Sequence, residues 1–216
     1  MDTTADNRRP IATRDAGWAR KTAAWLARHR VSPNVISVWS ILFSLLSLGA
    51  FYLDTQTVGY HAVWMLLAVA GIQLRLIMNL LDGMVAIEHQ QKSLTGGLFN
   101  EVPDRVSDTF TIAGVGLLVR DWPYGMDLAY FAIILSVTTA YIRTLGASLQ
   151  CGHHFLGPMA KQHRMALISG GCVVGIWYTG VFYYLLILMN IGLLITCYRR
   201  LARITAGLQN GNRNSY

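Results

Sequence analysis

Charged side chains are scarce in this chain of 216 residues. Asp, Glu, Lys and Arg make up 13% of the residues and hydrophobic residues 53%, whereas about 25% of a typical soluble domain is charged. A soluble domain with so few charges would not cover its surface, and the hydrophobic residues here fall in blocks instead of alternating. This composition excludes a disordered chain and a collagen-like repeat, and it predicts an integral membrane protein.

Cysteine and acidic residues are also few. The three cysteines, Cys151, Cys172 and Cys197, stand far apart, which excludes a disulfide scaffold and indicates free, packed thiols. Only 11 acidic residues oppose 18 Lys and Arg, which gives a net charge of +7. In a membrane protein such an excess indicates topology signals and contact with anionic lipid headgroups, so we expect membrane lipids and no nucleic acid as partners.

We expect no secretory signal in the N-terminal region, because it is polar up to Asp15 and no short apolar core precedes a cleavage site. We expect residues 1–14 to form a disordered tail. Residues 15–30 place Trp18 and Trp25 at helical spacing, with basic residues on other faces, which predicts an amphipathic helix at the membrane interface. The alternative is a basic topology signal that docks on nothing.

The next 170 residues, 31–200, contain six apolar stretches and predict an all-α domain of six transmembrane helices. The stretches are 35–53, 61–81, 98–119, 128–149, 165–178 and 181–198. An even number of spans puts both termini on one side. Lys and Arg gather in the termini and loops of that side, whereas Arg120 is the only basic residue in the opposite loops. We therefore expect cytoplasmic termini in a bacterial inner membrane, and residues 201–216 as a basic C-terminal tail.

Polar side chains interrupt the second and third stretches, although a charge inside a span costs about 2.5–3.5 kcal/mol on insertion scales. By spacing, two helical faces carry these groups: Arg75, Asn79 and Asp82 on one, and Asn100, Asp104 and Asp108 on the other, with Glu101 beside it. A short loop brings the two faces together, which predicts a polar cavity open to the cytoplasm. Carboxylate and amide oxygens suit a hard divalent cation, and the nearby basic residues suit a phosphate-bearing substrate.

Structural roles for the same residues remain open. Asp82 and Asp104 would form buried ion pairs with Arg75 and Arg105 if the charges served stability alone, although burying so many charges for that purpose is costly. Asp108 alone suits a contact between helices better than metal ligation. A small transporter is a further alternative, but it would need polar groups along the full depth of several spans, and here they gather at one end.

The spacing of the two polar faces resembles a known signature. The CDP-alcohol phosphatidyltransferase family has D-x2-D-G-x2-A-R-x8-G-x3-D-x3-D, and this chain reads Asn79-x2-Asp82-Gly83-x2-Ala86-Ile87-x8-Gly96-x3-Asn100-x3-Asp104. Every spacing fits and five of the eight positions match, while Asn79, Asn100 and Ile87 depart. The Ser32-Pro33-Asn34 start of the first span and the basic loop before the fifth also resemble the family, so the similarity covers about residues 15–200. Members with an N-x2-D-G start are poorly characterised bacterial proteins.

The resemblance implies a membrane enzyme of phospholipid synthesis. Such an enzyme transfers a phosphatidyl or related group from a CDP-linked lipid, usually CDP-diacylglycerol, to the hydroxyl of an alcohol acceptor and releases CMP. Two divalent ions, Mg²⁺ or Mn²⁺, assist the reaction, and family members often form homodimers.

The resemblance also implies roles for residues of this chain. Asp104 would be the general base. The metal ligands would be Asn79, Asp82, Asn100 and Asp104, with Glu101 and Asp108 as substitutes that restore charge. The substrate would contact Asn34, Gly83, Ala86, Gly96, Lys161 and Arg164, and Arg75 would replace the arginine missing at Ile87.

The departures from the signature leave a second function open. Two asparagines in place of aspartates halve the negative charge of the motif, which lowers the expected metal affinity. Pro103, next to the expected base, removes a backbone donor and predicts a kink that re-aims Asp104 or Glu101. The alternative is therefore a degenerate, non-catalytic relative that binds a CDP-linked lipid or a partner protein.

Overall fold

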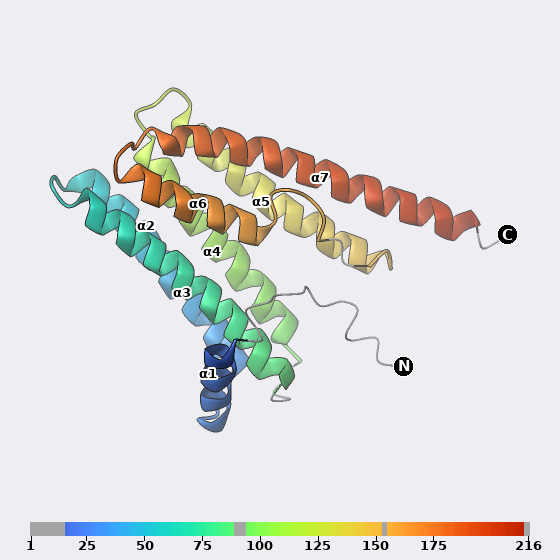
Figure 1. Ribbon diagram of the computed structural model, residues 1–216. Helices are drawn as coiled ribbons and strands as arrows, with labels where there is room; N and C mark the ends of the chain where they lie inside the picture. Colours follow the sequence, from blue (N-terminus) through green and yellow to red (C-terminus); the bar gives the residue numbers. More distant parts are fainter. Residues whose placement is uncertain (1–15, 89–93, 153–154, 214–216) are drawn as a thin grey trace.

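The computed structural model describes residues 16–88, 94–152 and 155–213, and in these ranges the chain forms helices and turns without strands (Figure 1). The predicted disordered tail, residues 1–14, lies outside them. The helices in the described ranges are α1 (Gly17–Arg28), α2 (Pro33–Gln56), α3 (His61–Glu88), α4 (Gly96–Leu118), α5 (Gly125–Ser148), α6 (Lys161–Gly175) and α7 (Val181–Arg213).

Four helices, α2, α3, α5 and α7, are long and apolar enough to cross a membrane. The polar residues in the first half of α4 and the 15-residue length of α6 keep these two below the same criterion. The chain is therefore an all-α, multi-pass membrane protein, as its composition predicts. The count of six spans stays a prediction.

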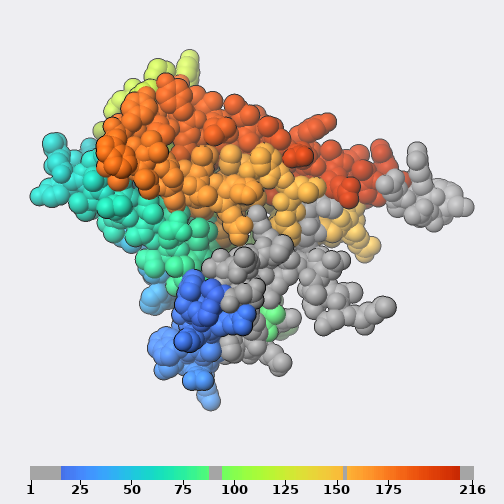
Figure 2. Space-filling model, in the orientation of Figure 1, coloured from blue at the N-terminus to red at the C-terminus, as the bar shows by residue number. Residues whose placement is uncertain are grey.

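The helix α1 packs against α3 through small residues. Ala19 and Ala23 are fully buried against a cluster that includes Leu81 and Met84 of α3, and Figure 2 shows α1 at the lower end of the molecule. Trp18 and Trp25 stay largely exposed. The helix thus has one face on the protein and an aromatic, basic remainder, which suits a membrane interface.

The helices α2 and α3 form a closely packed pair. Ser32 caps α2 by accepting a hydrogen bond from the backbone of Val35, with Pro33 in the first turn. Further along, Ser47 donates to the carbonyl of Ala68 across the interface at 3.2 Å. A Cβ on Gly71 would lie 2.5 Å from Ser47 Oγ and 2.7 Å from the carbonyl oxygen of Phe43. Small residues therefore allow the two helix backbones to lie close together.

The remaining helices complete one buried core. α4 packs on α2 and α5, α6 on α3 and α7, and α5 on α7. The core includes Phe51, Met65, Ile112, Phe182 and Met189, from four different helices. In Figure 1 the helices spread apart away from the α2–α3 and α6–α7 turns.

The C-terminal helix differs from the sequence-based expectation. α7 continues to Arg213, although we expected the sixth stretch to stop at Tyr198. Residues after Arg200 include the helix formers Leu201 and Ala202, and Ile204 is buried close to Gly146 of α5, so the helix has both propensity and a packing partner. α4 continues on both sides of Pro103, its eighth residue, and the kink stays a prediction.

Candidate functional site

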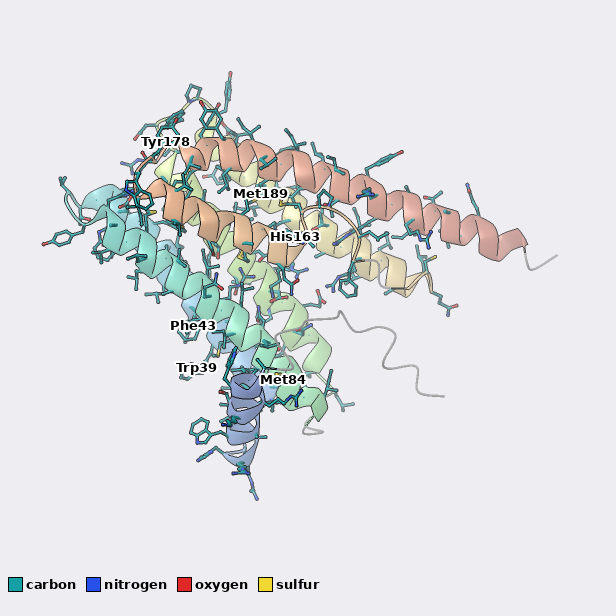
Figure 3. All side chains as sticks on the ribbon, viewed as in Figure 1. Trp39, Phe43, Met84, His163, Tyr178 and Met189 are labelled. Carbon is teal, nitrogen blue, oxygen red and sulfur yellow. The ribbon has the colours of Figure 1, made fainter. Side chains whose placement is uncertain are left out.

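A cavity of about 430 Å³ lies between the helices, and its lining is basic. All helices except α2 contribute to it within the described ranges. Its charged lining residues are Glu101, Asp104, Arg105, Arg143, Lys161, Arg164 and Arg200, so five cations oppose two carboxylates. Such a cavity suits an anionic ligand. In Figure 3, His163 marks the end of α6 that carries Lys161 and Arg164, and Tyr178 lies beyond the other end of this helix.

Both halves of the signature reach this cavity. Asn79 comes from α3, and Asn100, Glu101 and Asp104 come from α4. The other predicted site residues lie outside the lining, within the described part of the chain: Asn34, Arg75, Asp82, Gly83, Ala86, Gly96 and Asp108. Asn34 instead donates a hydrogen bond to Thr95 Oγ1 at 3.2 Å, which joins the start of α2 to the start of α4.

The carboxylate of Asp104 is surrounded by cations. Its Oδ1 forms an ion pair with Lys161 Nζ, and its Oδ2 lies 3.5 Å from Arg105 Nη2. Asp82 is 5% exposed, accepts a hydrogen bond from Ser37 Oγ at 2.6 Å and interacts electrostatically with both Asp104 and Lys161. The two signature aspartates are therefore coupled electrostatically, and Lys161 contacts Asp104 directly.

A buried ion triad lies behind the cavity. Asp108 Oδ1 pairs with Arg75 and Oδ2 with Arg164, the latter at 2.5 Å. Arg75 is fully buried and also donates to the carbonyl of Asp104, so the triad joins α3, α4 and α6. Asp108 as a substitute metal ligand and Arg75 as a phosphate ligand stay predictions, and in this geometry both side chains are buried and engaged with each other.

The second expected substitute, Glu101, is also engaged. Arg143 Nη2 of α5 lies 2.5 and 2.6 Å from its two carboxylate oxygens, and Arg105 Nη1 lies 3.4 Å from one of them. The Arg143 guanidinium stands over the ring of Phe155 at 5.4 Å. Arg143, Phe155 and Arg200 are cavity residues that we did not predict. The sequence signal for Arg143 is a charge inside an otherwise apolar stretch.

The side chains of this site match the ligand preferences of a divalent cation only in part. Within the described ranges, no group of three His, Cys, Asp or Glu side chains could hold a metal ion. The available donor set is the pair Asp82 and Asp104 with the amides of Asn79 and Asn100. These are hard oxygen donors of the kind that Mg²⁺ and Mn²⁺ prefer.

No protein-family model matches the chain. It is 28% identical over 160 residues to the inner membrane protein YnbA of Escherichia coli, which covers 73% of this chain and 75% of that protein. It is also 28% identical over 145 residues to an archaetidylinositol phosphate synthase of Pyrococcus horikoshii, covering 66% of this chain and 70% of that protein.

The fold is similar to that of a solved phosphatidylinositol phosphate synthase from Mycobacterium tuberculosis. With CDP-DAG bound, that enzyme gives a TM-score of 0.70 at 18% identity, covering 88% of this chain and 94% of that chain. The same enzyme with manganese and citrate gives 0.68 at 17% identity, covering 86% and 88%. Sequence and fold comparisons therefore agree with the resemblance to the CDP-alcohol phosphatidyltransferases that the signature predicts.

Proposed function

We propose that this protein is a membrane transferase of phospholipid synthesis. It moves a phosphatidyl or related group from a CDP-linked lipid to the hydroxyl of an alcohol acceptor and releases CMP. The observation that carries this proposal is the joint position of Asn79, Asn100 and Asp104 in one basic cavity with Lys161 and Arg164. Two helices bring the signature residues to a place where an anionic substrate fits. The two synthases to which the chain is similar support the same reaction class.

Asp104 is the residue that accepts the proton of the acceptor hydroxyl. The hydroxyl oxygen then attacks the lipid-linked phosphorus, the bond to the CMP phosphate breaks, and CMP leaves. Asp104 reaches the cavity from α4, and a carboxylate can take this proton once the hydroxyl lies within hydrogen-bond distance. Before this step the carboxylate has to exchange its contacts with Lys161 and Arg105 for the hydroxyl.

Other residues bind and orient the substrates. Lys161 and Arg164 hold phosphate oxygens, as their place in the lining allows. Gly83 leaves room on α3, since a Cβ there would meet nothing within 4 Å, and the nucleotide approaches this backbone together with Ala86 and Gly96. The oxygens of Asn79, Asp82, Asn100 and Asp104 hold the divalent cation, which when bound neutralises the pyrophosphate and the leaving CMP.

The proposed architecture adds α4 and α6 as spans to the four apolar helices. Their polar groups face the protein interior, as the burial of Asp108 and Arg164 illustrates. Residues 31–200 then form a six-span domain with α1 at the interface, both termini and the cavity face the cytoplasm of a bacterial inner membrane, and two copies form a homodimer.

The test is CMP release by the protein purified in detergent. The assay contains CDP-diacylglycerol, Mg²⁺ or Mn²⁺ and a pool of alcohol acceptors. The Asp104→Asn variant should lose at least about 10²-fold in rate, whereas Asp121→Asn, a matched change at a 90% exposed side chain outside the cavity, should keep the wild-type rate. Full activity in Asp104→Asn would refute the assigned base.

A non-catalytic relative is the second candidate. It is favoured by the two cations on Asp104 and by asparagine at two signature positions. Binding of CDP-diacylglycerol without CMP release, over the whole acceptor pool, would establish it in place of the transferase.

A further inference from the structure

We propose that the ammonium of Lys161 takes the place of a second divalent cation beside Asp82 and Asp104, so that the site binds one divalent cation per chain. This inference rests on the proposed function, to which the first cation belongs. It concerns what this chain does differently from the two-cation signature that it resembles.

The first argument is charge. Asparagine at positions 79 and 100 leaves two carboxylates in the signature, Asp82 and Asp104. Their two negative charges balance one divalent cation and not two, and ligand charge is a main determinant of the affinity of such sites. A second divalent ion would enter a site that is already neutral and lies in a cavity with excess positive charge.

The second argument is that other carboxylates do not restore the missing charge. Asp108 is 1% exposed and both of its oxygens are bound by arginines, Arg75 and Arg164. Glu101 receives Arg143 on both oxygens. Recruiting either carboxylate would strand a buried or half-buried guanidinium, which is costly.

The third argument is the position of Lys161 itself. Its ammonium forms an ion pair with Asp104 and attracts Asp82 electrostatically without a direct contact, so one cation already acts on both signature carboxylates. Two consecutive ion pairs between α4 and the start of α6 hold Lys161 in this position. Asp104 and Asp108 are four residues apart on α4, and their partners Lys161 and Arg164 are three apart on α6. Because the ion pair between Asp108 and Arg164 is buried, it fixes the start of α6 and therefore the position of the Lys161 ammonium.

The experiment counts Mn²⁺ bound by the full-length protein in detergent, from the electron paramagnetic resonance signal of free Mn²⁺ during a titration. The wild type should bind one Mn²⁺ per chain. Lys161→Gln should bind Mn²⁺ about tenfold more tightly, because it removes a positive charge next to the ligands. Lys161→Arg should resemble the wild type, as should Lys21→Gln, a matched change at an exposed lysine of α1.

Two bound Mn²⁺ in the wild type, no bound Mn²⁺, or an unchanged affinity in Lys161→Gln would overturn the inference. The wild-type count decides even if Lys161→Gln does not fold. CMP release measured on the same preparation separates this inference from the proposed function. Release with two bound Mn²⁺ would refute only the role of Lys161, and one bound Mn²⁺ without release would refute only the transferase.

Discussion

Asp108→Asn removes the single negative charge that two buried arginines share. Arg75 is fully buried and Arg164 is 3% exposed, so neither guanidinium can recover its hydration when the carboxylate is lost. Removing one partner of a buried ion pair costs about 3–5 kcal/mol. The asparagine keeps one oxygen that accepts a hydrogen bond, so we expect the lower limit, a loss of about 3 kcal/mol in the free energy of unfolding.

A loss of this size should lower the unfolding temperature by about 6–12 °C in a chain of this length. The measurement is thermal unfolding in detergent followed by tryptophan fluorescence. Asp121→Asn is the matched control, because its ion pair with Arg120 is exposed and 3.6 Å long; such pairs contribute about 0–1 kcal/mol.

A triple variant, Arg75→Met with Asp108→Leu and Arg164→Met, tests the cause. It removes all three charges and strands none, so it should recover most of the stability that Asp108→Asn loses. The reasoning fails if Asp108→Asn unfolds at the wild-type temperature, or if the triple variant is less stable than the single one.

Three further predictions concern other parts of the molecule. Gly71→Ala should lower stability by about 1–3 kcal/mol through its clash with Ser47 and the α2 backbone, while Gly49→Ala, which meets nothing within 4 Å, should be neutral or stabilising in the same unfolding assay. Trp18→Ala should raise the KM for the CDP-linked lipid about fivefold with kcat unchanged, because Trp18 lines the cavity, and Trp25→Ala on the same helix should not. A fluorescent protein fused to the C-terminus should fluoresce in bacterial cells, and a dark but exported fusion would contradict the cytoplasmic termini.

The sequence was sufficient to predict much of the fold because apolar stretches and charged interruptions are local signals. Charge scarcity predicted a membrane protein, and the start of α2 was marked by Ser32 and Pro33. The end of α7 was missed because Arg199 and Arg200 look like a stop in the sequence, whereas Arg200 is buried and donates to the carbonyls of Leu156 and Thr139.

The site was predictable only where its spacing is local. The i, i+3 and i, i+4 pattern placed Asn79, Asn100 and Asp104 on two faces, and the cavity joins them. The ion-pair partners that other helices supply could not be predicted from such local spacing. Arg143 meets Glu101 because α5 packs on α4, and Arg164 reaches Asp108 from the start of α6; no local pattern encodes these contacts.

The length of α6 has a consequence for how a lipid reaches Asp104. Its 15 residues give about 22 Å of helix, about 8 Å less than the hydrocarbon thickness of a bilayer. In the proposed six-span architecture, a span this short would draw the headgroup layer inward around it, and its first residue is the lysine that touches Asp104. A lipid diffusing sideways in the inner leaflet would then bring its pyrophosphate to the carboxylate while its acyl chains stay in the membrane.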